Sequence, residues 1–192
     1  MKSVLISIQP KWCELIASGK KMVEARKTKP KLETPFKVYI YETQGRTETP
    51  FVDEEGHHIF KGRGQVIGEF VCDKIVEFEN DWWDRAFYET AERACLRADE
   101  LAIYLGKKDV GYGWHISDLV IYDEPRALQD FIVTSKIGCC NEGKCRGCQY
   151  FDKGDGVDIE DDCVAEFNTD EFKPLRRPPQ SWCYVEEVRE DG

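Results

Sequence analysis

The sequence contains no long apolar run. No stretch approaches the roughly 18 apolar residues that a membrane-spanning helix needs. The opening residues, MKSVLISIQP, contain neither the long apolar segment nor the small-residue cleavage site of a secretory signal. We therefore expect no contact with a membrane and a cytoplasmic location.

Positive charge is also scarce over most of the chain. The sequence has 27 Lys and Arg against 37 Asp and Glu, a net charge of −10, which argues against a protein that coats DNA or another nucleic-acid backbone. The charge is unevenly spread, however, because residues 1–37 hold nine Lys and Arg against three Asp and Glu. We expect any surface that faces an anion to involve this segment, although a solvated basic face is an alternative.

The 192 residues are enough for one domain with its own core, and 41% of them are hydrophobic. Short runs with β-branched and aromatic residues predict strands, and only a few segments have the spacing of helices. We expect an α+β fold, a small mixed β-barrel of five or six strands with two or three short helices. The predicted strands are 4–8, 22–28, 36–43, 65–78, 112–125 and 181–188; the predicted helices are 11–18, 82–88 (capped by Asp81) and 98–106, with a helical turn at 128–131. Gly68 lies inside the long predicted strand and indicates a bulge or bend.

A cluster of charged residues lies between the first helix and the second strand. Gly19, Lys21, Glu24 and Arg26 have the spacing G-x-K-x-x-E-x-R. Because side chains alternate along a strand, Glu24 and Arg26 should share one face, with Lys21 beside them at the turn. A guanidinium in such a cluster has donors left for a phosphate or a carbonyl. The spacing predicts a ligand site, and the alternative is a salt-bridge triad that fixes the corner between helix and strand.

This motif, followed by VIGEF and by GYGWHISDLVIYDEP, closely resembles the ASCH domain, a member of the PUA-like β-barrels. The resemblance covers residues 2–131 and resumes at 178–187, so we expect a single domain, 1–192, with an insertion at 138–171. It implies a compact barrel with a cleft lined by Lys21, Glu24 and Arg26. In the family, such a cleft is proposed to bind RNA or a nucleotide-like ligand.

The resemblance also implies an enzymatic alternative. Some ASCH proteins are similar to amidohydrolases that remove the acetyl group from N4-acetylcytidine with a Thr nucleophile, a Lys and a Glu. Lys21 matches the family's Lys and is the candidate catalytic residue, but Glu24 stands where the Thr would be, and a carboxylate cannot form the same acyl-enzyme. Thr28 lies about 13 Å further along the strand, too far to substitute. No residue aligns clearly with the family's catalytic Glu, so we expect a binding protein rather than an enzyme.

Other candidate ligand contacts lie near predicted strand ends. Trp12 and Trp114 could stack on a base, although a Trp in a small barrel is more often part of the core. Gln180 and Ser181 precede the last strand, at a position where barrel mouths collect polar contacts. His115 can equally be structural, since no Ser-His-Asp or Cys-His arrangement is evident.

Nine cysteines in a chain of this kind should be thiols or metal ligands rather than disulfides. Five of them lie between 139 and 163, and the C-x-x-C spacing is typical of a tetrahedral, structural Zn²⁺ site. The predicted ligands are Cys140, Cys145, Cys148 and Cys163, with Cys139 as the alternate to Cys140. An iron–sulfur cluster and metal-free thiols are the competing interpretations. We expect the remaining cysteines to be buried singly in helices or strands: Cys13, Cys72, Cys95 and Cys183.

Overall fold

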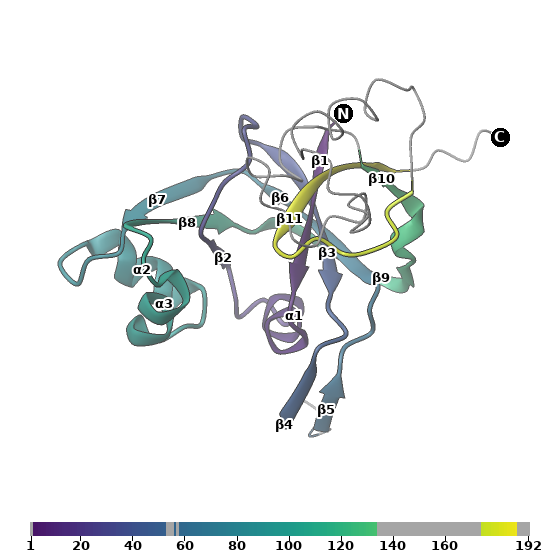
Figure 1. Ribbon diagram of the computed structural model, residues 1–192, viewed down its shortest axis with the longest axis horizontal. Coiled ribbons are helices and arrows are strands. Elements are labelled where there is room, and N and C mark those ends of the chain that lie inside the picture. The colour runs from purple at the N-terminus through teal and green to yellow at the C-terminus, as the bar shows by residue number, and fades with distance from the viewer. Residues whose placement is uncertain (1, 53–55, 57, 134–173, 188–192) are drawn as a thin grey trace, which may run out of the picture.

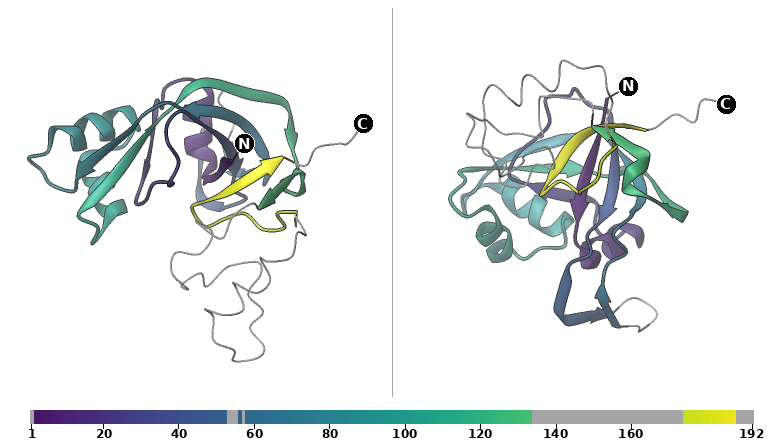
Figure 2. Two further views of the ribbon diagram at one scale, coloured as in Figure 1. Left: turned by 90° about the horizontal axis from the view of Figure 1, so that it is seen from above. Right: turned by 45° about the vertical axis from the view of Figure 1, so that its right-hand side comes forward.

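Six strands form the main sheet of the computed structural model, which describes residues 2–52, 56, 58–133 and 174–187 (Figure 1). They are β1 (Ser3–Ile8), β3 (Phe36–Glu42), β6 (Val66–Cys72), β9 (Ser117–Arg126), β10 (Phe131–Val133) and β11 (Trp182–Glu187). Their order across the sheet is β10-β11-β1-β3-β6-β9, with β1 and β3 parallel and all other neighbours antiparallel. The sheet curls strongly, as Figure 2 shows, so the predicted α+β barrel-like fold is confirmed.

A second sheet lies beside the first and consists of β2 (Val23–Arg26), β8 (Val110–His115) and β7 (Ile75–Glu79), in this order. Helices α2 (Arg85–Arg93) and α3 (Ala98–Leu105) pack on it (Figure 1), and their apolar side chains form a small core with Phe78. A hairpin of β4 (Arg46–Val52) and β5 (His58–Lys61) extends from the main sheet.

The main core explains why apolar residues follow one another in the first strand instead of alternating with polar ones. Every residue of β1 is buried, because the central strands are covered on both faces. Val4, Ile6 and Ile8 face helix α1 (Pro10–Ala17), whose Cys13 and Ile16 lie in the same cluster. Leu5 faces the opposite side, with Tyr39 and Phe131 among its neighbours.

Two predicted strands are each divided between the two sheets. Residues 65–78 form β6 in the main sheet and β7 in the second sheet, and residues 112–125 belong to β8 and β9. The breaks lie at Asp73–Lys74 and at Ile116, where the chain turns a corner of the barrel. His115 ties the two corners together: its backbone N–H donates to the Lys74 carbonyl at 2.9 Å, and its Nδ1 lies 2.6 Å from Asp73 Oδ1.

The predicted irregularity at Gly68 is confirmed. The pairing of β6 with both β3 and β9 shifts register next to this residue. A Cβ at Gly68 would collide with the carbonyl oxygen of Val120 on β9. The missing side chain therefore lets two curved strands approach each other closely.

The helices agree with the sequence except at the two ends of α2. Asp84, not Asp81, caps this helix, since its Oδ1 accepts a hydrogen bond from the Ala86 N–H at 2.8 Å. The helix therefore begins at Arg85 and not at Trp82, and it ends at Arg93 and not at Tyr88. Helix α3 and the single turn η1 (Leu128–Asp130) lie where predicted. In the described part of the chain, no helix has the length and apolar character needed to cross a membrane.

Candidate functional site

The first helix and its exit bring the charged motif into position. Pro10 begins α1, where its missing N–H costs nothing. After the helix, Gly19 has φ +73°, a left-handed conformation that ends helices and that glycine adopts without strain. The Lys21 N–H then donates to the Leu15 carbonyl at 2.8 Å, and the chain enters β2 directly.

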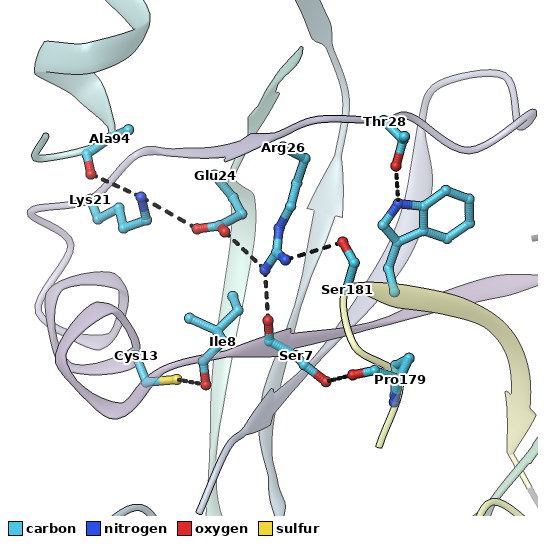
Figure 3. A network of polar contacts seen from close by, with 11 residues as sticks. Ser7, Ile8, Cys13, Lys21, Glu24, Arg26, Thr28, Ala94, Pro179 and Ser181 are labelled. Carbon is cyan, nitrogen blue, oxygen red and sulfur yellow. Dashed lines mark hydrogen bonds and ion pairs between the residues drawn. The ribbon is translucent and has the colours of Figure 1, made fainter. Parts of the chain in front are cut away.

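Lys21, Glu24 and Arg26 form a buried triad (Figure 3). Lys21 Nζ lies 3.3 Å from Glu24 Oε2, and Arg26 Nη2 lies 2.9 Å from Glu24 Oε1. Only 3%, 7% and 7% of the surfaces of these three residues are exposed. Lys21 Nζ also donates to the carbonyl of Ala94, at the end of α2, at 2.8 Å. The ion pairs of the alternative interpretation, the salt-bridge triad, are therefore present.

Arg26 joins the triad to the main sheet. Its Nη2 donates to the Ser7 carbonyl at 2.7 Å, and its Nη1 donates to Ser181 Oγ at 3.3 Å. The Ser7 hydroxyl donates to the Pro179 carbonyl at 2.6 Å, and the Ser7 N–H donates to the Ser181 carbonyl at 2.9 Å. One guanidinium thus holds β1, β2 and the segment before β11 together, as Figure 3 shows.

The triad contains two cations and one carboxylate. Two of its buried polar atoms have no hydrogen-bond partner among the described residues: Arg26 Nε, and Glu24 Oε2, whose contact with Lys21 is an ion pair. Burial makes such charges depend strongly on each other, because each one has lost its hydration. With two cations and one carboxylate, the triad has one more positive than negative charge, and its burial leaves little water to screen that charge.

Tyr104 of α3 belongs to this site, although sequence reasoning missed it. Burial raises the pKa of its hydroxyl, while Arg26 lowers this pKa and Glu24 raises it, so both charges lie close to the phenol. Lys27 Nζ lies 5.1 Å from the centroid of the Tyr104 ring, and 37% of the residue's surface is exposed. No motif connects Tyr104 to β2, because only the packing of α3 on the second sheet brings them together.

The two predicted tryptophan contacts have different surroundings. Trp12 is partly buried, and its ring centroid lies 4.6 Å from Lys11 Nζ and 5.2 Å from Lys21 Nζ. Trp114 is completely buried and packs edge-on against Phe36, as the core interpretation predicts. The structure therefore places Trp12, and not Trp114, where a solvent-borne ligand can reach it.

The remaining candidates lie near the triad or outside the described residues. Ser181 is partly buried and bonded to Arg26, and its neighbour Gln180 is exposed. In the described ranges, no group of His, Cys, Asp and Glu side chains could hold a metal ion. The predicted zinc ligands Cys139, Cys140, Cys145, Cys148 and Cys163 all fall outside these ranges.

None of the four cysteines in the described ranges forms a disulfide. Cys13, Cys72 and Cys183 are buried in regular elements, as predicted, whereas Cys95 is partly exposed in the turn after α2 with φ +55°. Burial raises the pKa of the Cys13 thiol well above its ordinary value, and the nearby carboxylates of Glu42 and Glu24 raise it further. Cys13 is therefore a neutral core residue beside the triad.

Comparisons with known proteins identify the fold. No protein-family model matches the sequence, and no curated protein matches it significantly. The crystal structure of ASCH from Zymomonas mobilis is similar to this chain, with a TM-score of 0.53 and 17% sequence identity; the alignment covers 98% of this chain and 88% of that one. Structures of two point mutants of that protein also align, each with a TM-score of 0.49. One mutant is 20% identical, and its alignment covers 67% of this chain and 77% of that one. The other mutant is 16% identical, and its alignment covers 98% of this chain and 89% of that one. The similarity to the first of these structures confirms the predicted ASCH, PUA-like fold.

Proposed function

We propose that this chain, which has the ASCH fold, binds RNA or a nucleotide-like ligand at the surface around Lys21, Glu24 and Arg26. Catalysis is not part of the proposal, because Glu24 is held by two ion pairs and provides no hydroxyl nucleophile. The proposal also includes the cytoplasmic location and the structural zinc that the sequence predicts.

One observation supports this function above the others: two accessible aromatic rings flank the triad, and each has a lysine beside it. Trp12 lies next to Lys11, and Tyr104 lies next to Lys27. Proteins that bind single-stranded nucleic acids combine aromatic rings, on which bases stack, with cations that contact the backbone. Lys11 and Lys27 are both exposed, so their ammonium groups can exchange water for phosphate oxygens.

The triad supports the same ligand class through its charge. Its one excess positive charge is buried, where screening by salt is weak, and Lys21 Nζ lies 5.2 Å from the centroid of the Trp12 ring. The Arg26 guanidinium reaches Ser181 on the side where the strand β11 begins. An anion bound beside Ser181 would therefore lie close to the Arg26 guanidinium and be attracted by it.

Fluorescence anisotropy of a labelled, single-stranded RNA decamer tests the proposal, at about 50 mM and about 200 mM salt. Replacement of an exposed lysine is the sharpest perturbation, since it leaves the buried network intact. We expect Lys27→Gln to weaken binding and to reduce the salt slope by about one. The matched control is Lys108→Gln, which removes the same charge from an exposed position before β8. Tyr104→Ala should weaken binding at both salt concentrations, because stacking contributes about 1–3 kcal/mol per base.

Two results would contradict this function. One is RNA and nucleotide affinity that is equal in the wild type, Lys27→Gln and Lys108→Gln. The other is turnover of N4-acetylcytidine that disappears in a folded Lys21→Met variant, which would favour the amidohydrolase alternative instead.

A further inference from the structure

A patch of exposed aromatic residues lies at the start of α2, separate from the charged triad. The exposed fractions are 55% for Trp82, 92% for Trp83 and 44% for Tyr88. The Trp82 ring contacts Tyr88 and the buried Phe87, with centroids 6.5 Å and 6.1 Å apart. Large aromatic side chains exposed together are uncommon on a monomer and mark interaction surfaces.

The backbone around these tryptophans is held in place. Asp81 Oδ1 accepts a hydrogen bond from the Trp83 N–H at 3.1 Å. Asp84 uses both carboxylate oxygens, accepting from the Ala86 N–H at 2.8 Å and from the Glu79 N–H at 2.6 Å. The exposed position of Trp83 is thus built into the loop, and binding there would not need to order the backbone.

A shallow, acidic depression of about 570 Å³ lies beside Trp83. No lysine, arginine or histidine lines it; its lining residues are Glu77, Phe78, Glu79, Asp81, Trp83, Asp84, Ala86 and Val110. Lys29 pairs with Glu77 at 2.9 Å, and the neighbouring Arg85 pairs with Glu89 on the helix. Glu79 makes no ion pair within the described residues, so the depression keeps a net negative charge.

The strand next to the depression lies at the edge of its sheet, where the Glu79 N–H is already bonded to the Asp84 carboxylate. β7 is the outer strand of its sheet in the described part of the chain, and it carries Glu77 and Glu79. An extended peptide can add to such an edge through backbone hydrogen bonds, while its side chains select the partner.

We propose that Trp82, Trp83 and the acidic depression dock an extended, Lys- and Arg-rich segment of a partner protein. The carboxylates would attract the cationic side chains, and the exposed indole of Trp83 would bind one of them through a cation–π contact. The same carboxylates repel phosphate, so this surface is distinct from the proposed RNA site. The inference does not depend on that function.

A fluorescein-labelled octapeptide of alternating lysine and valine is the probe, and its binding to the full chain is read by anisotropy. Trp83→Ala should weaken binding about five-fold or more, and Glu79→Gln should weaken it as well. The control Glu124→Gln removes the same charge from an exposed position on β9, in the other sheet, and should bind like the wild type. A peptide with glutamate in place of lysine should not bind.

Four outcomes would overturn the inference: no binding of the lysine peptide, equal binding to Trp83→Ala and wild type, equal losses in Glu79→Gln and Glu124→Gln, or dimerisation that Trp83→Ala abolishes. The third would show that the whole acidic protein attracts the peptide, and the fourth that a second copy of this chain covers the patch. Circular dichroism checks the fold of each variant. Should Trp83→Ala fail to fold, Glu79→Lys on the strand edge replaces it, with the same expected loss.

Discussion

The carboxylate of Glu24 offers the most direct test of the buried triad. Glu24→Gln keeps the shape of the side chain and removes its charge. In the wild type this carboxylate lies 2.9 Å from Arg26 Nη2 and 3.3 Å from Lys21 Nζ, and 9% of its side chain is exposed. The substitution leaves two buried cations without a counter-charge. Loss of one partner from a buried ion pair costs about 3–5 kcal/mol, and we expect a decrease of this size in the free energy of unfolding.

Urea denaturation followed by tryptophan fluorescence and by circular dichroism measures this decrease, provided that the two transitions coincide. Glu89→Gln is the matched control. Glu89 pairs with Arg85 at 2.6 Å, but 91% of the Arg85 side chain and 56% of the Glu89 side chain are exposed. Because water screens this pair, its loss should cost less than about 1 kcal/mol.

A second substitution separates charge from packing. If the cost of Glu24→Gln comes from an unpaired cation, then Lys21→Met in the same chain should recover part of it, because one buried charge is then removed. Unpaired buried charge is not the cause of the loss if Glu24→Gln lowers the free energy of unfolding no more than Glu89→Gln does. The same conclusion follows if the effects of Glu24→Gln and Lys21→Met simply add.

Three further predictions concern the core, the thiols and the cysteine-rich segment. Trp114→Ala should lower the free energy of unfolding by about 3–5 kcal/mol in urea denaturation, because its fully buried ring would leave a cavity. Burial raises the pKa of the Cys72 thiol from 9.0 to about 12, so the unfolded chain loses this proton at a lower pH than the folded chain does. The free energy of unfolding should therefore fall as the pH rises from about 9 to 12. Cys72→Ala should make this fall smaller, as measured by urea denaturation midpoints over that pH range. Elemental analysis should find one zinc ion per chain, lost in Cys145→Ser and in Cys148→Ser; metal-free wild type with all five thiols of residues 139–163 alkylated would contradict this.

Local chemistry determined the elements that contain the triad. Gly19 ends the first helix, and the alternation of side chains along β2 places Glu24 and Arg26 on one side and Val23 and Ala25 on the other. These features depend on residues within a few positions of one another, so the sequence alone predicts them. The ASCH-like fold was also predictable, because the motif and the later strands occur in the family's order.

The strand breaks at Asp73–Lys74 and Ile116 were not predictable in this way. Strand-forming residues flank both breaks closely, and the pair Asp73–Lys74 or the single Ile116 is too short a signal to divide a predicted strand. Only the pairing of β6 with β3, and of β7 with β8, assigns the two halves to different sheets. The corner is a property of long-range pairing and not of the residues at the corner.

Long-range packing also decides which residues complete the site around the triad. The sequence by itself determined that Lys21, Glu24 and Arg26 meet, because a single turn and strand carry all three. Tertiary structure alone brought Tyr104 and the Ala94 carbonyl to them, made Ser181 a partner of Arg26, and placed Trp114 in the core. These contacts join segments far apart in the chain, and they form only when two sheets and three helices bury their apolar faces together.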